Sequence, residues 1–254
     1  MIDAIRLKIE RADEHLKLLE SELARYYATH PAEFVPEGDV HRDELGGEYV
    51  FGSFKVDAPP PLLAMIMGDA LQNLRSALDY LIWELVAANH QTPGEYNAFP
   101  ICRSEKEFMT ELGRNRMAGV NPDVIAEVAR LQPYFDGADV DKSFLWTLHH
   151  FANINKHRRI LLTRLKTMPI PPGFVTSQDA QGLVHAMVNP PPTNIDTKVG
   201  PVPIVDGKVQ MNPAFIGYVI FDEGPPKGYE VWAFLEATSR FIPEHVLPHF
   251  ERFF

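Results

Sequence analysis

The segment between residues 62 and 89 carries polar side chains of types that bind ligands or do chemistry. Steps of three and four residues place them on one face of a helix; they are Asp69, Gln72, Asn73, Ser76 and Asp79, with Arg75 beside them. The rest of the segment is apolar nearly all round, as in a buried helix. A buried polar line needs partners, because each unpaired group costs about 1–3 kcal/mol. Two interpretations stay open: a structural network in which Arg75 pairs with Asp79 or Asp69, and a face that contacts a ligand.

A second cluster of polar and basic residues ends near residue 159. On a helix, His149, Asn153 and His157 share one face at four-residue steps. The densest positive run of the chain follows there: Lys156, His157, Arg158 and Arg159. Cations at the end of a helix are favoured by its dipole, which explains the run structurally. The alternative is an anion site for a phosphate or a nucleic-acid backbone.

Other chemical signatures are absent from the sequence. Two histidines and an amide spread over a helix are a poor ligand set for one metal ion, so we expect no metal and no cofactor. The chain has no glycine-rich phosphate loop, no Gly-x-Ser-x-Gly, no His-Glu-x-x-His and no paired-cysteine zinc pattern. Cys102 is the single cysteine, which excludes a disulfide framework. We expect it to be a small buried side chain.

Prolines divide the chain into a helical part and a strand-rich part. Proline breaks a helix interior, and the long proline-free stretches are 1–30, 62–92 and 134–168. In the first stretch apolar residues recur at spacings of three and four: Ile2, Ile5, Ile9, Ala12, Leu16, Leu19, Leu23 and Tyr26. This pattern predicts an amphipathic helix. Its apolar line packs either on another helix of the chain or on a second copy, as a homodimer.

Further elements follow from caps, turns and β-branched runs. Helices are expected at 104–113, where Ser104 and Glu107 form a capping box, at 122–131 and at 141–157. Strands are expected at 48–56, 159–166, 182–188, 202–211, 216–221 and 229–235. Asp206-Gly207 predicts a hairpin turn within the fourth of these. A final helix is expected at about 238–253.

The expected fold is a single α+β domain over residues 1–254. A helical bundle (about 1–158) packs with a mostly antiparallel sheet from the C-terminal half (about 159–237), and a C-terminal helix closes it. The strand at 48–56 is expected to pair with strands after residue 158 and so to join both halves.

Composition and charge limit the functions. The chain has 24 basic and 34 acidic residues, for a net charge of −10, which argues against a broad nucleic-acid surface but leaves a local phosphate or RNA contact open. No run approaches the apolar length of a membrane span, and the acidic start of the sequence is unlike a signal peptide. We therefore expect a cytoplasmic protein without membrane contact.

Two segments carry a family resemblance. Gly68-Asp69-Ala-Leu-Gln-Asn-Leu-Arg-Ser-Ala-Leu-Asp-Tyr80 and Asn153-Ile-Asn-Lys-His-Arg158 resemble a group of uncharacterised bacterial proteins. The helical half is also loosely similar to the HEPN superfamily, helical bundles that include metal-independent ribonucleases acting as dimers. The HEPN signature is an arginine, a polar residue, three further residues and a histidine; Arg75-Ser76 fits its start, with Tyr80 in the place of the histidine.

Two function hypotheses result. The first is a noncatalytic binding or interaction protein with a polar seam between two helices: Asp69, Asn73, Arg75 and Asp79 on one, and Asn153, Lys156, His157 and Arg158 on the other. The second, implied by the HEPN resemblance, is an endoribonuclease. In it, Arg75 would bind the scissile phosphate, His157 would act as acid or base, and Lys156 and Arg158 would hold the backbone. Arg75 close to His157 in an open cleft would favour the enzyme, and Arg75 in a closed ion pair with an aspartate would favour a structural role.

Overall fold

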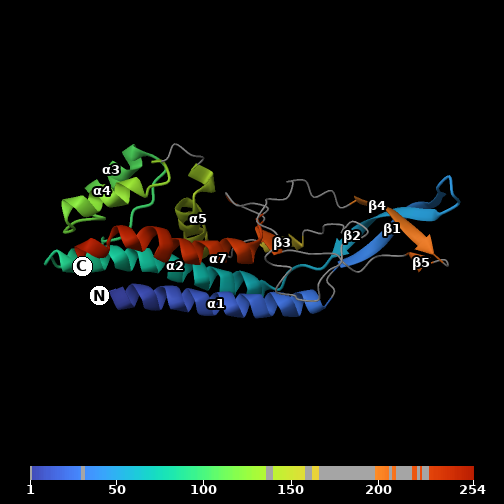
Figure 1. Ribbon diagram of the computed structural model, residues 1–254, viewed down its shortest axis with the longest axis horizontal. Coiled ribbons are helices and arrows are strands. Elements are labelled where there is room, and N and C mark those ends of the chain that lie inside the picture. The colour runs from blue at the N-terminus through green and yellow to red at the C-terminus, as the bar shows by residue number, and fades with distance from the viewer. Residues whose placement is uncertain are drawn as a thin grey trace.

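The computed structural model of the chain describes residues 2–29, 32–135, 140–157, 162–165, 198–205, 208–209, 219–221, 224 and 229–254. The α-helices are α1 (Ile2–Ala28), α2 (Pro61–Ala88), α3 (Glu105–Gly113), α4 (Pro122–Arg130), α5 (Phe144–His157) and α7 (Val231–Phe241). The strands are β1 (Ala32–Arg42), β2 (Glu48–Val56), β3 (Leu162–Leu165), β4 (Lys198–Val205), β5 (Lys208–Val209) and β6 (Val219–Phe221). All strand pairs are antiparallel, and they form a four-stranded sheet and a two-stranded sheet of β3 and β6. The larger sheet lies apart from the helices (Figure 1), whereas Phe221 of β6 packs on Phe151 of α5 and Phe234 of α7. A fold of helices and antiparallel sheets is of the α+β class.

Three long helices form the body of the molecule. α1, α2 and α7 lie side by side, and α5 contacts both α2 and α7 (Figure 1). The apolar line of α1 is buried within the chain, at Ile5, Ile9, Ala12, Leu16, Leu19, Leu23 and Tyr26. Its packing against α2 confirms the core interpretation of this line, so a homodimer through α1 would have to use the outer side of that helix.

The predicted helix starts are confirmed by their caps. The Ser104 hydroxyl accepts a hydrogen bond from the Glu107 amide at 3.2 Å, and the Glu107 carboxylate accepts one from the Arg103 amide at 2.7 Å. The Asn121 side chain accepts from the Asp123 amide at 2.9 Å at the start of α4. The bonds to the Glu107 and Asp123 amides satisfy N–H groups of the first helical turn, which have no partner within the helix, and the bond from the Arg103 amide completes the capping box.

The larger sheet joins early and late parts of the sequence. Its strand order is β1-β2-β4-β5, and β2 pairs with β4 through Glu48↔Ile204 and Val50↔Val202. This pairing confirms the expected connection between the strand at 48–56 and later strands. Two of the four strands precede residue 57, however, so in this sheet only β4 and β5 come from the C-terminal half. β3 and β6 pair antiparallel in a second sheet that lies wholly in that half, as predicted. Figure 1 places this sheet beyond the ends of α1 and α2 rather than over the helices.

β1 was not expected from the sequence. It contains Pro36 and Gly38, which usually argue against a strand, and many charged residues. Proline is tolerated at the edge of a sheet, and β1 is an edge strand. The register shifts between Glu37 and His41, and Gly38 within that shift has a φ of +80°, so the glycine belongs to a bulge.

The strand predicted at 229–235 is wrong, because Val231–Phe241 form α7. The Glu230 carboxylate caps this helix by accepting hydrogen bonds from the Trp232 and Ala233 amides. The chain then continues as a π turn (Ile242–Val246) and 3₁₀ turns at Leu247–His249 and Glu251–Phe253. These changes of helix type fall at Pro243 and Pro248, which cannot donate α-helical hydrogen bonds. The closing C-terminal helix is thus confirmed, but it begins earlier than expected.

Other strand predictions are met in part. β3 lies inside the expected strand at 159–166, and β6 inside the one at 216–221. β4 pairs with β5 in a tight register, Val205↔Lys208, consistent with the expected hairpin, although Asp206 and Gly207 themselves lie outside the described residues. The strand expected at 182–188 also lies outside them. None of the helices in the described ranges has the length and hydropathy that a membrane span requires.

Candidate functional site

α5 meets α2 at a glycine. Gly68 is buried, and a Cβ atom added there would lie 2.3 Å from Asn155 Oδ1 and 2.7 Å from Asn155 Nδ2. The Asn155 amide therefore rests directly on the backbone of α2, an arrangement that only glycine permits without moving the amide. Gly68, Gln72 and Arg75 follow each other at steps of four and three residues, so all three face the same side of α2, toward α5.

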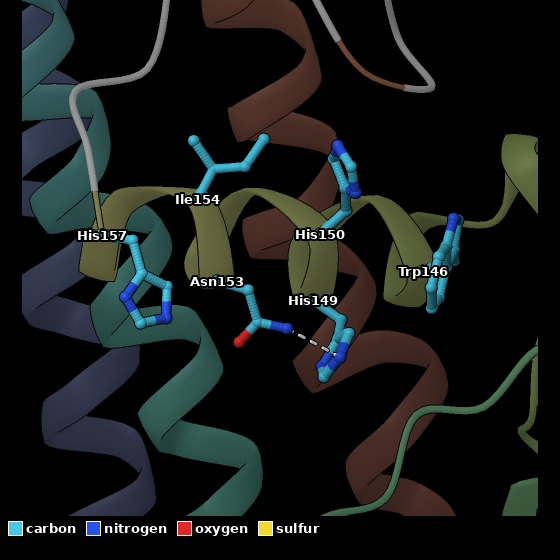
Figure 2. Close-up of a pocket in the computed structure, with 6 residues that line it drawn as sticks. All are labelled: Trp146, His149, His150, Asn153, Ile154 and His157. Carbon is cyan, nitrogen blue, oxygen red and sulfur yellow. Dashed lines mark hydrogen bonds between the residues drawn. The ribbon is translucent and has the colours of Figure 1, made fainter.

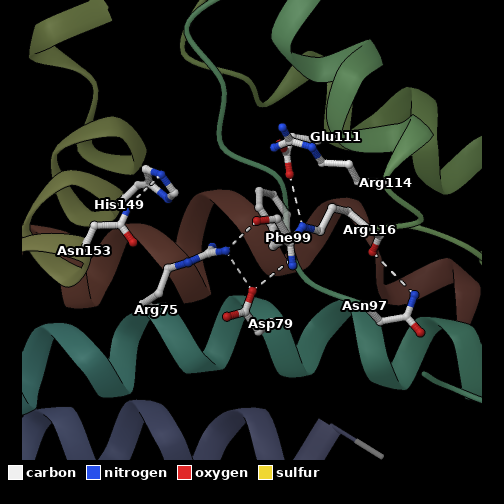
Figure 3. Close-up of polar contacts among 9 residues, drawn as sticks. All are labelled: Arg75, Asp79, Asn97, Phe99, Glu111, Arg114, Arg116, His149 and Asn153. Atoms are coloured by element: carbon white, nitrogen blue, oxygen red, sulfur yellow. Dashed lines mark hydrogen bonds and ion pairs between the residues drawn. The ribbon is translucent and has the colours of Figure 1, made fainter. Parts of the chain in front are cut away.

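Arg75 is held in a closed polar network (Figure 3). Its Nη2 atom donates to the Phe99 carbonyl at 2.6 Å and forms an ion pair with Asp79 Oδ1 at 2.8 Å. The same Asp79 oxygen accepts a hydrogen bond from the Phe99 amide at 3.0 Å. The three groups tie the loop before α3 to α2. The Arg75 side chain is 9% exposed, so this ion pair is shielded from solvent on the cation's side.

The pKa of Arg75 responds both to its burial and to the charged groups around it. Burial lowers the pKa of the Arg75 guanidinium, the Asp79 carboxylate opposes this, and the nearby Arg116 adds to the lowering. Arg116 has its own ion pair with Glu111 at 3.1 Å, on the far side of Phe99 (Figure 3). The seam thus holds paired charges.

Three buried polar atoms have no hydrogen-bond partner among the described residues: Gln72 Oε1, Arg75 Nη1 and His149 Nδ1. The first two belong to α2 and the third to α5. Figure 3 shows the His149 ring on the side of Arg75 that faces α5, away from Asp79. The polar seam predicted between these helices therefore contains hydrogen-bonding capacity that its own side chains leave unused.

The outer side of α5 forms an open surface depression (Figure 2). It is lined by Trp146, His149, His150, Asn153, Ile154 and His157. Within it, Asn153 Nδ2 lies 2.9 Å from His149 Nε2, which fixes the orientation of both side chains. Four aromatic or imidazole rings and one amide give this surface flat faces and hydrogen-bonding edges.

His149 is neutral at physiological pH. Burial lowers its pKa to about 4, and the positive charges of Arg75 and Lys156 act in the same direction. A neutral imidazole donates from one nitrogen and accepts at the other. The positive field that disfavours His149 protonation also favours negative charge on a molecule in the depression.

The predicted site residues separate into two groups. Arg75 and Asp79 form the structural pair that was one of the two interpretations. Asn73 Nδ2 donates to the Asp69 carbonyl at 2.9 Å, a local bond within α2, and the Asp69 side chain is exposed.

Asn153 and His157 line the depression on α5. Lys156 is exposed beside them, and Arg158 lies outside the described residues. Of the predicted seam, Asn73, Arg75 and Asp79 on α2 are thus bonded within the protein, whereas Asp69 and the described α5 residues face solvent.

Arg75 and His157 are not bonded to each other. No hydrogen bond or ion pair within the described part of the chain links them, and the histidine whose pKa responds to Arg75 is His149. His157 follows His149 by eight residues, about 12 Å along the helix axis. The sequence placed both histidines on one face but could not say which one meets Arg75.

Metal and thiol chemistry find no support at the described residues. Nowhere in the described ranges do three His, Cys, Asp or Glu side chains form a group that could hold a metal ion. Cys102 is buried, as expected, and burial raises the pKa of its thiol to about 12. A thiol of this kind is not a nucleophile at neutral pH.

Comparison with known proteins finds no matching family model, curated protein or solved structure.

Proposed function

We propose that the protein is a noncatalytic binding protein whose ligand occupies the depression along α5, supported from behind by the Arg75 seam. One observation carries the proposal: the buried guanidinium of Arg75 is engaged with Asp79 and the Phe99 carbonyl, whereas Asn153 and His157 face the open depression. The bonds of Arg75 hold α2 and the loop before α3 in fixed positions, and the side chains on the surface of α5 contact the ligand.

The lining argues for a flat ligand that carries an anionic group. Trp146 and the neighbouring imidazoles offer ring faces for stacking, and the Asn153 amide offers hydrogen bonds. Lys156 and Arg75 create the positive field that acts on His149. A planar ring with a carboxylate or phosphate uses both properties.

The ribonuclease alternative is not favoured. The Arg75 side chain is 9% exposed and its Nη2 atom is committed to Asp79 and the Phe99 carbonyl, so a scissile phosphate would have to enter the closed seam to reach the guanidinium. No hydrogen bond or ion pair joins Arg75 to its assumed partner His157 among the described residues. We therefore expect no RNA cleavage by the wild-type protein, a result that incubation with several RNAs would check.

The proposal is tested with matched pairs of probes. Benzoate and adenosine monophosphate carry a ring and a negative charge, whereas benzamide and adenosine carry the ring alone. Amide NMR signals of α5 should shift with the charged member of at least one pair and much less with its neutral counterpart. Lys156→Ala should weaken that binding about tenfold, equivalent to one close charge contact.

The matched control is Lys17→Ala, an exposed lysine on α1. It removes the same charge from the protein at a distance from the depression and should leave the affinity unchanged. Equal loss in both variants, or no α5 shift with any of the four probes, would contradict a flat anionic ligand in this depression.

A further inference from the structure

One side of α2 is open to solvent along the length of the helix. Its other sides pack on α1, α5 and α7, and most of its residues are buried. A line of residues at steps of three and four is nevertheless exposed or half-exposed throughout, and steps of this size share one helix face. We call this line the α2 stripe; it consists of Leu62, Met65, Asp69, Asn73, Ser76, Tyr80, Trp83 and Ala87.

The two ends of the α2 stripe carry large apolar side chains. Leu62 and Met65 lie near the start of α2, and Tyr80 and Trp83 lie near its end. Each of the four side chains is between 42% and 62% exposed. A single exposed apolar residue is ordinary, but several on one face, with methionine and aromatic residues among them, are typical of a protein–protein interface.

The α2 stripe is complementary to its own reverse. An antiparallel pair of stripes centred between Leu74 and Arg75 places Met65 of each copy beside Trp83 of the other, a favourable contact of sulfur with an aromatic ring. The same register places Asn73 beside Ser76, whose amide and hydroxyl groups can exchange hydrogen bonds. An interface between two identical chains related by a two-fold axis requires this kind of self-complementarity.

The charges select the same arrangement. Asp69 is the charged residue of the stripe, and the antiparallel register places it beside Tyr80 of the second copy. Tyr80 carries a cation, because Nζ of Lys8 on α1 lies 5.4 Å from the centre of its ring. Each Asp69 carboxylate therefore meets an ammonium group, and two-fold symmetry makes this contact twice. A parallel pair would instead place Asp69 opposite Asp69, which is unfavourable.

We infer that two copies of the chain associate through the α2 stripe, antiparallel about a two-fold axis, with Asp69 of each copy paired with Lys8 of the other. The steps of three and four residues suit two helices that pack along their length at a small crossing angle. This surface shares no residue with the depression on α5, so the inference is independent of the proposed ligand.

Sedimentation velocity of the intact protein over a range of concentrations measures the association. The wild type should form a species of two chains. Asp69→Lys and Lys8→Glu should each raise the dissociation constant at least about tenfold, because both symmetric contacts change from attractive to repulsive. Both positions are exposed or half-exposed, so the circular dichroism of the helices should stay that of the wild type.

An equal mixture of the two variants gives the decisive measurement. In a mixed pair the introduced lysine faces the introduced glutamate, and the native Asp69 of one chain faces the native Lys8 of the other. The mixture should therefore associate about as tightly as the wild type, although each variant alone does not. A mixture as weak as its components would overturn the inference, and so would variants that associate as tightly as the wild type.

Two methionines of similar exposure test the apolar part of the surface. Met65 is 62% exposed on the stripe, and Met109 is 60% exposed on α3. Met65→Ser should weaken the association, whereas Met109→Ser should leave it unchanged. Equal effects of the two substitutions would contradict the inference, as would a wild-type protein that remains monomeric up to about 1 mM.

Discussion

The two sides of the polar seam differ in how far their side chains are committed. On α2, Arg75 and Asp79 bond to each other and to both polar groups of the Phe99 backbone. On α5, the Asn153 side chain bonds to His149 of its own helix, and Lys156 extends into solvent. Polar residues of similar chemistry thus differ in their contacts. Those on the buried helix α2 bond to neighbouring segments, and those on the half-exposed helix α5 leave hydrogen-bonding groups open to solvent.

The sharpest test of this difference is Arg75→Met, which removes the charge and keeps much of the length. It leaves the Asp79 carboxylate without its cationic partner and the Phe99 carbonyl without the Arg75 donor, so we expect the free energy of unfolding to fall by about 3 kcal/mol. Lys156→Met should change it by less than about 0.5 kcal/mol. Urea denaturation of both variants decides the matter, and similar losses would mean that the two sides do not differ.

A second test uses pH. The pKa of His149 is about 4 in the folded protein and is about 6.5 in an unfolded chain, so between these values the unfolded state binds more protons. Stability contributed by neutral His149 is therefore complete above pH 6.5 and is lost as pH falls toward 4, by up to about 3 kcal/mol.

His149→Phe cannot titrate at this position and should be less sensitive to acid than the wild type in denaturation at pH 7 and pH 4.5. His157→Phe, at an exposed position of the same helix, should keep the wild-type pH dependence. If the two variants respond alike, the seam does not hold His149 in its neutral form.

Because α2 and α5 meet at Gly68 and Asn155, we expect substitutions at these two positions to have non-additive effects on the free energy of unfolding. Gly68→Ala should destabilise the wild type by about 1 kcal/mol, since its Cβ displaces the Asn155 amide. In an Asn155→Ala background the same change should stabilise by about 1 kcal/mol through helix propensity.

Gly113→Ala is the control for this cycle, because a Cβ there meets no atom within 4 Å. It should not destabilise the protein in either background. Additive effects of Gly68→Ala and Asn155→Ala would show that the helices do not meet at this point.

The smallest effect is expected on the open side of the seam. Asn153→Ala removes one exposed hydrogen bond to His149 and should cost less than about 1 kcal/mol, because water can replace the amide. The variant should nevertheless change the NMR signals of the His149 ring. A loss of stability as large as that of Arg75→Met would place Asn153 among the structural residues.

Much of the helical fold follows from local sequence patterns. The apolar spacing of α1 and the caps at Ser104 and Asn121 each act over a few residues, so they are visible without a structure. The strand at 48–56 was also predicted with the bounds that it has.

The errors arise where one nearby group overrides a local preference. Val231–Leu235 is rich in β-favouring residues, but the Glu230 carboxylate satisfies two amides and starts a helix there. In β1, Pro36 and Gly38 are accepted only because the strand is an edge with a bulge. Neither condition is visible in composition alone.

The site was half predictable for a similar reason. The spacing of the residues predicts that Arg75 and Asp79 share one helix and that His149, Asn153 and His157 share one face of another. Which residues meet depends on where the helices cross, and that is set by Gly68. A glycine inside a helix costs about 1 kcal/mol against alanine, so its presence at position 68 is itself a sequence signal of close approach between helices.

The pairing of β2 with β4 also has a consequence in time. The two strands lie roughly 150 residues apart in the sequence, and ribosomes add about 5–20 residues per second. For about 8–30 s of synthesis, β1 and β2 can therefore form only a hairpin with one edge of β2 unpaired. A chain that ends after α5 would keep that edge open permanently, and we expect it to associate with itself, whereas the complete chain closes the edge with its own β4.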